Sequence, residues 1–208
     1  MSLRVVAISA GLSDSSSTTL LAQRYGEAIR AARPDASFEV VTLRDLAHDI
    51  TDATIVGFAS PRLQHVIDQV AAADALVVVA PTFKASYPGL FKSFFDALEA
   101  EVLTGKPVAL AATGGTARHS LVIDYAMRPL FAYLQTMTVP TGVFASPHDW
   151  ASSNRTGEGA DALGARIERA VGELLSVAEG GGTGRAFDDS IDLFSETMLS
   201  ISDPRPQA

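Results

Sequence analysis

The chain alternates between continuous apolar runs and segments in which apolar residues recur every three or four positions. Unbroken apolar runs are typical of strands covered on both faces of a parallel sheet, and the longer spacing is typical of helices. The predicted strands span residues 3–9, 37–43, 75–80, 106–113 and 138–146. The predicted helices span about residues 17–32, 61–70, 90–98, 118–135 and 163–175, with a long loop before the second. This alternation predicts an α/β fold, a flavodoxin-like doubly wound sheet of five parallel strands flanked by helices.

Length and composition indicate one domain followed by a tail. The 208 residues are 47% hydrophobic, which suffices for a substantial core. The glycine-rich run at 180–184 is typical of a flexible linker. We therefore expect a domain at residues 1–179 and a linker with a flexible acidic tail at residues 180–208.

The formal charge of −8 argues against nucleic acid as a partner, because a nucleic-acid site needs clustered lysine and arginine. No apolar run approaches the roughly 20 residues of a membrane span. Residues 3–8 are too short for the apolar part of a signal peptide, so we expect a cytoplasmic protein. The chain has no cysteine, and the spacing of its four histidines does not suggest a metal site.

The first candidate loop, residues 10–19, follows the first predicted strand and leads into a helix. It carries six hydroxyl side chains and neither lysine nor arginine. Hydroxyls and backbone amides at a helix amino terminus can hold a phosphate dianion. The spacing matches neither a P-loop nor a dinucleotide fingerprint. A serine-rich helix cap without a ligand would explain the same residues about as well.

Two further loops are expected at the same edge of the sheet, where ligands of doubly wound folds bind. Residues 81–90 follow the most apolar strand, and Pro88 and Gly89 open the next helix. Residues 113–120 contain Gly114 and Gly115, whose backbone can approach a flat ligand and whose amides can bind its ring. An ordinary glycine turn is the alternative, but one ligand shared by three loops is the more economical explanation.

The three loops resemble the NAD(P)H-dependent FMN reductases of flavodoxin-like fold, especially the flavin reductase components of two-component alkanesulfonate and luciferase-like monooxygenases. The resemblance covers about residues 3–146 and rests on motifs at 10–19, 80–89 and 112–130. It implies FMN and NAD(P)H as cofactors. The cofactor-binding residues that we expect from it are Gly11, Leu12, Ser15, Ser17, Thr18, Pro81, Thr82, Phe83, Lys84, Ser86, Thr113, Gly114 and Gly115. Relatives often carry an arginine among the serines of the first loop, which is absent here, so we expect weak retention of FMN.

The function implied by the resemblance is hydride transfer from reduced nicotinamide to FMN, with reduced flavin supplied to a partner monooxygenase. No protein acid or base is needed for that step, and no residue is assigned a certain catalytic role. The alternatives are a flavodoxin-type FMN electron carrier and an FMN-bound quinone or azo reductase. Phe83 and Tyr87 lie in the second loop and no aromatic residue lies at 113–120, which predicts an open flavin face suited to a nicotinamide.

The predicted helix at 118–135 is apolar nearly all round, so we expect another subunit to bury it in a homodimer or homotetramer. Pro129 has no amide hydrogen to pair with the carbonyl of Tyr125, which predicts a kink or a widening. The resemblance implies a π-bulge there, at a subunit interface near the flavin, with a structural or flavin-exchange role for Tyr125. A tyrosine packed in the core of a proline-kinked helix is the alternative.

Overall fold

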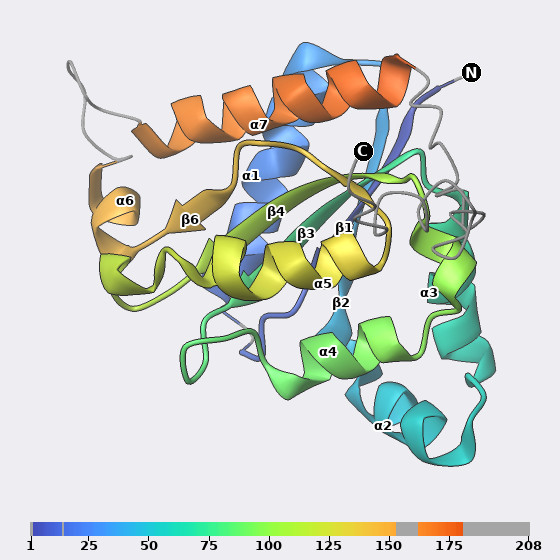
Figure 1. Cartoon of the computed structure of the whole chain (residues 1–208). Helices are drawn as coiled ribbons and strands as arrows, with labels where there is room; N and C mark the ends of the chain where they lie inside the picture. The colour runs from blue at the N-terminus through green and yellow to red at the C-terminus, as the bar shows by residue number, and fades with distance from the viewer. Residues whose placement is uncertain (1, 14, 153–161, 181–208) are drawn as a thin grey trace, which may run out of the picture.

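The central sheet has the strand order β2-β1-β3-β4-β5, with parallel pairing throughout and β6 also paired to β4 (Figure 1). The structure is a computed structural model that describes residues 2–13, 15–152 and 162–180. The strands are β1 (Arg4–Ser9), β2 (Ser37–Thr42), β3 (Ala75–Pro81), β4 (Pro107–Thr113), β5 (Met137–Thr138) and β6 (Val143–Ala145). This is the flavodoxin-like order, so the predicted fold class is confirmed.

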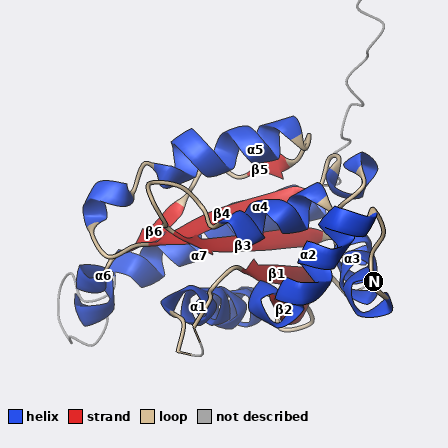
Figure 2. Cartoon of the chain, turned by 90° about the horizontal axis from the view of Figure 1, so that it is seen from below, coloured by secondary structure: helices blue, strands red, loops and turns tan. Residues whose placement is uncertain are grey.

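Helices cover both faces of the sheet, as Figure 2 shows. The face that carries α1 and α7 also buries Val77 and Val79 of β3, whereas Leu76 and Val78 face the opposite core. Both cores therefore draw on the same central strands, which explains their lack of polar alternation. The helices of the first face are α1 (Ser17–Ala32) and α7 (Ala162–Glu179), and those of the second are α2 (Ala47–Val56), α3 (Pro61–Ala72), α4 (Gly89–Asp96) and α5 (Arg128–Tyr133).

Two predicted helix starts are confirmed by their caps. The Ser16 hydroxyl accepts hydrogen bonds from the amides of Thr18 and Thr19 at 3.2 and 3.4 Å. The Ser60 hydroxyl accepts one from the amide of Leu63 at 3.2 Å. Both side chains satisfy amides that have no partner within the first helical turn.

Two segments differ from the prediction. The expected long loop contains a 3₁₀ turn at Leu43–Leu46 and helix α2, which buries only Ile50 and Ala53 and so has a weak apolar period. The expected fifth strand is divided into β5 and β6, both paired to β4. Pro140 lies between them and cannot donate to a ladder, which explains the interruption.

The predicted helix at 118–135 is also divided. It contains a 3₁₀ turn at Ala117–His119, a π-helix at Ile123–Met127 and then α5. The amide of Arg128 donates to the carbonyl of Ile123, five residues earlier. The widening predicted from Pro129 is confirmed.

This helical segment is not buried on all sides in the single chain. The exposed fractions of Leu121, Tyr125 and Tyr133 are 60%, 79% and 84%. The alternative of a packed core tyrosine at position 125 is therefore wrong. The helical segment has apolar residues on all sides because, in addition to its buried side chains, it carries large apolar side chains on the surface of this chain.

The expected tail lies outside the described residues except for Gly180, so the division at residue 179 stays a prediction. Within the part of the chain that the structure describes, no helix is long and apolar enough to cross a membrane. Over the same residues, no three His, Asp or Glu side chains gather as a set that would hold a metal ion.

Candidate functional site

A pocket of about 470 Å³ lies at the carboxyl edge of the sheet. Its walls come from the start of α1, the ends of β3 and β4, and the segment that follows β6. The lining residues are Ser17, Pro81, Thr82, Phe83, Thr113, Gly114, Gly115, Ala145, Pro147 and Trp150. The structure thus brings the three predicted loops together at one pocket.

The remaining predicted binding residues lie around this pocket without lining it. Gly11 and Thr18 are the buried members of the first loop. Leu12 and Ser15 are exposed on the same loop, where the Ser15 hydroxyl is open to solvent. Lys84 and Ser86, which are exposed and half-buried, belong to the turn beyond Phe83 and are described below.

Gly11 fixes the path of the first loop. A Cβ atom at this position would lie 1.9 Å from Oγ of Ser16 and 3.3 Å from Cβ of Thr18. Because Ser16 caps α1, the chain can pass over the helix start only where residue 11 has no side chain. The exposed hydroxyls of Ser15 and Ser17 flank this capped amino terminus. The loop can therefore offer hydroxyls and the positive end of a helix dipole to an anion.

Thr18 joins the first loop to the third. Its hydroxyl lies 2.9 Å from the hydroxyl of Thr113 at the end of β4, and both side chains are buried. This bond joins the first loop to the third within the protein, and the phosphate-binding role of Thr18 stays a prediction.

We expect the substitution Thr18→Val to destabilise the fold by about 1–3 kcal/mol, because it leaves the buried Thr113 hydroxyl without a partner. Thermal unfolding measures the loss, and Thr18→Ser serves as the control that keeps the hydroxyl. In the double variant Thr18→Val with Thr113→Val, the loss should be smaller than the sum of the two single losses. Additive losses would contradict a direct bond between these side chains.

The second loop forms a tight hairpin turn. The amide of Phe83 donates to the carbonyl of Ser86 at 2.8 Å, and the amide of Ser86 donates back at 3.1 Å. Lys84 and Ala85 have φ values of 50° and 67°, which is the backbone of a type I′ turn and is costly for residues with a Cβ atom. The turn holds Phe83 at the pocket, where 47% of its surface is exposed, and places Lys84 at the exposed tip.

The third loop is tied to its neighbours by backbone bonds. The amide of Thr82 donates to the carbonyl of Thr113 at 2.7 Å, and the amide of Gly114 donates to the carbonyl of Ala145 at 3.2 Å. The Gly114 amide is therefore already engaged, contrary to the expectation that both glycine amides meet a ring. Among the described residues, the amide of Gly115 makes no hydrogen bond and remains available to a ligand.

Two further features shape this wall of the pocket. A Cβ atom on Gly114 would lie 2.7 Å from Cζ of Phe144, whereas one on Gly115 would meet nothing within 4 Å. The Thr82 hydroxyl is buried and has no hydrogen-bond partner among the described residues. Because buried hydroxyls are normally paired, this one is suited to a ligand group.

The wall formed by Ala145, Pro147 and Trp150 was not predicted. No helix was predicted between the fifth strand and residue 163, and the resemblance ended at about residue 146, but the structure has a helix there, α6 (Pro147–Ser152). Strand β6 ends at the pocket and directly precedes this helix, so the helix lies at the pocket wall. Trp150 joins Phe83 as a second aromatic residue in the lining, and the open flavin face stays a prediction. The one available signal was that Trp150 is the only tryptophan of the chain.

Helix α6 is anchored by a polar cluster. One carboxylate oxygen of Asp149 accepts hydrogen bonds from the amide and hydroxyl of Ser146 at 2.8 and 2.6 Å. The other pairs with the guanidinium of Arg166 on α7, which also donates to the carbonyl of Phe144 at 3.1 Å. Burial alone would raise the pKa of Asp149, but the Ser146 bonds and the Arg166 charge lower it below its usual value.

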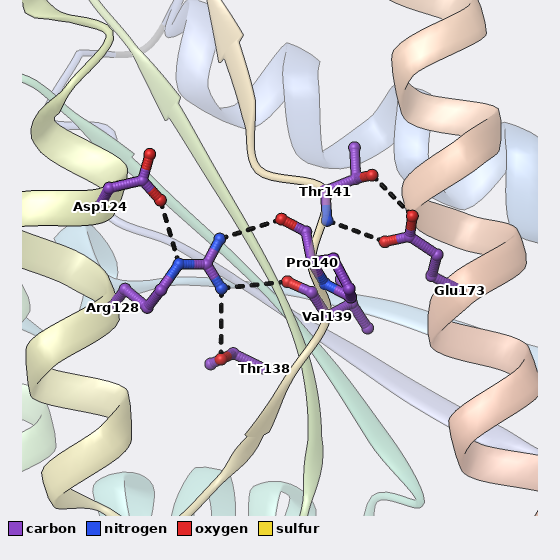
Figure 3. Close-up of polar contacts among 7 residues, drawn as sticks. All are labelled: Asp124, Arg128, Thr138, Val139, Pro140, Thr141 and Glu173. Atoms are coloured by element: carbon purple, nitrogen blue, oxygen red, sulfur yellow. Dashed lines mark hydrogen bonds and ion pairs between the residues drawn. The ribbon is translucent and has the colours of Figure 1, made fainter.

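The π-helix is fastened to the β5–β6 connection by Arg128, as Figure 3 shows. Its Nε donates to Asp124 at 3.0 Å, one turn earlier. Its Nη1 donates to the Thr138 hydroxyl at 3.3 Å and to the Val139 carbonyl at 3.1 Å, and its Nη2 donates to the Pro140 carbonyl at 3.1 Å. One side chain therefore satisfies the carbonyls of Val139 and Pro140 in the connection between β5 and β6.

The same connection is held from the opposite face by α7. Glu173 accepts hydrogen bonds from the amide and the hydroxyl of Thr141 at 2.8 and 2.7 Å (Figure 3). A Cβ atom on the next residue, Gly142, would lie 2.7 Å from Cγ2 of Ile123, the first residue of the π-helix. The π-helix is thus seated directly on the chain that leads to β6 and the pocket.

Comparisons with known proteins agree with this geometry. Residues 3–151 match the family model described as NADPH-dependent FMN reductase. An FMN reductase (NADPH) from Pseudomonas aeruginosa is 41% identical over 147 residues, which are 71% of this chain and 78% of that protein. The NADH-dependent FMN reductase SfnF from Pseudomonas fluorescens is 38% identical over 169 residues, or 81% of this chain and 88% of that protein.

Two solved structures extend the similarity. An oxidoreductase from Corynebacterium diphtheriae superposes with a TM-score of 0.79 at 43% identity, covering 86% of this chain and 98% of that one. The apo form of an NADH:FMN oxidoreductase, EMOB, superposes with a TM-score of 0.69 at 29% identity, covering 83% and 90%. Both similarities extend over most of the described chain.

Proposed function

The chain belongs to the NADPH-dependent FMN reductase family, and we propose that it transfers hydride from NADH or NADPH to FMN. The observation that carries the proposal is the single pocket into which the α1 start, the β3 loop and the β4 loop converge. Relatives named for NADPH and for NADH both match this chain, so either nucleotide is a candidate donor.

Residues that line the pocket or lie beside it fit FMN in three respects. The Ser15 and Ser17 hydroxyls and the α1 amino terminus suit a phosphate. Gly115 has open space before it, which suits the close approach of a flat ring. The unpartnered Thr82 hydroxyl and the Gly115 amide suit the polar edge of such a ring.

Bound FMN supplies the hydride acceptor, and the protein residues bind and orient. Ser15 and Ser17 would hold the phosphate by donated hydrogen bonds. Pro81 and Phe83, which line the pocket, would present an apolar wall to the ring. The Gly115 amide and the Thr82 hydroxyl are placed to stabilise negative charge at the ring edge by hydrogen bonding.

The lining of this pocket contains no ionisable side chain. Direct hydride transfer between two cofactors needs no protein acid or base, so this lining suits the proposed step. A pocket without charged side chains also leaves the affinity for FMN to hydroxyls, amides and apolar contact. We therefore propose that FMN is held loosely and that its reduced form is released to a flavin-dependent monooxygenase.

The proposal is tested by following NADH and NADPH oxidation by the purified protein with FMN, with a quinone, with an azo dye and with no acceptor. The absorbance spectrum of the protein as isolated is recorded beside it. We expect FMN-dependent oxidation and little flavin in the isolated protein. A preparation that keeps its flavin through dialysis and oxidises neither nucleotide would be a flavodoxin-type carrier. Preference for the quinone or azo dye with flavin retained would indicate that reductase class.

We propose further that the exposed apolar residues of the helical segment at residues 118–135 form a subunit interface of a homodimer or homotetramer. Support comes from Leu121, Tyr125 and Tyr133, which together expose large apolar side chains. The π-helix is joined to the β5–β6 connection, so a subunit seated there is linked to the chain leading to the pocket.

We expect Tyr125→Ala to change the oligomer mass and to lower turnover with free FMN, while the fold stays intact because the side chain is 79% exposed. Light scattering and steady-state kinetics measure the two effects. Phe58→Ala is the matched control, since Phe58 is 72% exposed in the loop between α2 and α3. Wild-type mass and turnover in the Tyr125 variant would remove this residue from both roles.

A further inference from the structure

Two aromatic side chains line the pocket, Phe83 from the β3 loop and Trp150 from α6. They come from segments almost seventy residues apart, and Trp150 is half-buried. The same pocket includes Ser17 at the start of α1, so an aromatic surface and a phosphate-binding helix start lie at one cavity. FMN and a nicotinamide nucleotide both combine a phosphate with a flat heteroaromatic ring.

The indole ring of Trp150 is held from α1. The guanidinium carbon of Arg24 lies 5.1 Å from the ring centroid, which is the distance of a cation–π contact. Arg24 lies seven residues after Ser17 on α1, about two helical turns away. Since Arg24 occupies one face of the indole, the pocket meets the remaining face or the ring edge.

The backbone that carries Trp150 is fixed as well. Its neighbour Asp149 accepts both hydrogen bonds of Ser146 and pairs with Arg166. Arg166 in turn binds the carbonyl of Phe144 on β6. A side chain on a short helix with these anchors is preorganised, which reduces the entropy that ligand binding must overcome.

We infer that Trp150 is a ligand-binding residue that contacts the heteroaromatic ring of the flavin or of the nicotinamide nucleotide. The inference rests on the proposed function, because both ligands come from it. An apolar indole adds little to the binding of a phosphate dianion, but it contacts a flat polarisable ring over a large area. Arg24 then has a supporting role, in which its charge holds the indole rather than the phosphate.

The test compares Trp150→Leu, which removes the aromatic ring, with Trp150→Phe, which keeps one. Phe58→Leu is the matched control, because it removes an exposed aromatic side chain outside the pocket. Flavin fluorescence gives the Kd of FMN and of riboflavin for each protein, and steady-state kinetics give the KM of NADPH and NADH. Thermal unfolding checks that the variants are folded.

We expect Trp150→Leu to raise the Kd of FMN and of riboflavin about tenfold, the effect of losing one aromatic stacking contact. The Kd values of Trp150→Phe should stay within about threefold of the wild-type values, and those of Phe58→Leu should equal the wild-type values. A rise in the KM of the nicotinamide nucleotide alone would assign the contact to that ring. A loss for FMN without a loss for riboflavin would place the contact at the phosphate and overturn the inference.

Unchanged Kd and KM values in folded Trp150→Leu would also overturn the inference, but they would not contradict the proposed reductase function. The proposed function fails separately, if the wild-type protein itself oxidises no nucleotide in the presence of FMN. The wild-type measurement therefore precedes the variants.

Discussion

Replacing Gly11 with alanine is expected to weaken FMN binding by about a hundredfold to ten-thousandfold. The new Cβ atom would lie 1.9 Å from Oγ of Ser16, and no rotation of a capping side chain relieves that contact while the cap is kept. The loop must move, and the hydroxyls that hold the phosphate move with it. Losing two charge-assisted hydrogen bonds of about 1.5–3 kcal/mol each gives this range.

Flavin fluorescence titration measures the loss, and Gly172→Ala supplies the control. Gly172 lies within α7, and a Cβ atom there would meet nothing within 4 Å. Alanine in a helix interior should stabilise the fold by up to about 1 kcal/mol and leave FMN affinity unchanged. An unaltered Kd in Gly11→Ala would exclude the first loop from the flavin site.

The adjacent glycines of the third loop are expected to differ in their effect on stability, while alanine at either position should weaken FMN binding. Gly114→Ala places a Cβ atom 2.7 Å from Cζ of Phe144, a buried side chain of β6. Overpacking of this kind costs about 1–3 kcal/mol, which lowers Tm by roughly 2–12 °C in a chain of this length. The displaced loop should also bind FMN more weakly.

Gly115→Ala should leave Tm close to that of wild type, because the new methyl group meets no protein atom within 4 Å. The methyl group nevertheless enters the lining of the pocket, so we expect FMN affinity to fall. Calorimetry and flavin titration on both variants separate the two effects. If Gly115→Ala binds FMN as well as the wild-type protein does, no ring approaches this position closely.

The fold followed from the sequence where one physical signal dominated. The unbroken apolar runs of β3 and β4 lie between two helical layers, which bury both faces of each strand. The helix starts predicted at residues 17 and 61 are confirmed, and in the structure the Ser16 and Ser60 hydroxyls cap the free amides there. Pro129 predicted a kink or a widening because its missing amide leaves the Tyr125 carbonyl without its usual donor, and the resemblance implied the π-bulge that the structure has at Ile123–Met127.

The sequence was less informative where contacts between residues far apart in the chain determine the local structure or the position of a side chain. Helix α2 has only two buried side chains, so its period is hard to distinguish from that of a loop. The Thr18 and Thr113 hydroxyls pair across 95 positions, a contact that neither residue's local sequence predicts. Trp150 reaches the pocket because β6 and the Asp149 cluster place α6 there, which no local pattern encodes.

The most direct test of the central claim, that this pocket serves hydride transfer to FMN, is anaerobic stopped-flow mixing of the protein and FMN with NADPH or NADH. Absorbance near 450 nm follows the flavin. We expect complete, enzyme-dependent bleaching with at least one nucleotide, and slower bleaching at low FMN concentration in Gly11→Ala and Gly115→Ala. Flavin that remains oxidised with both nucleotides, at concentrations where titration shows FMN bound, would contradict the central claim.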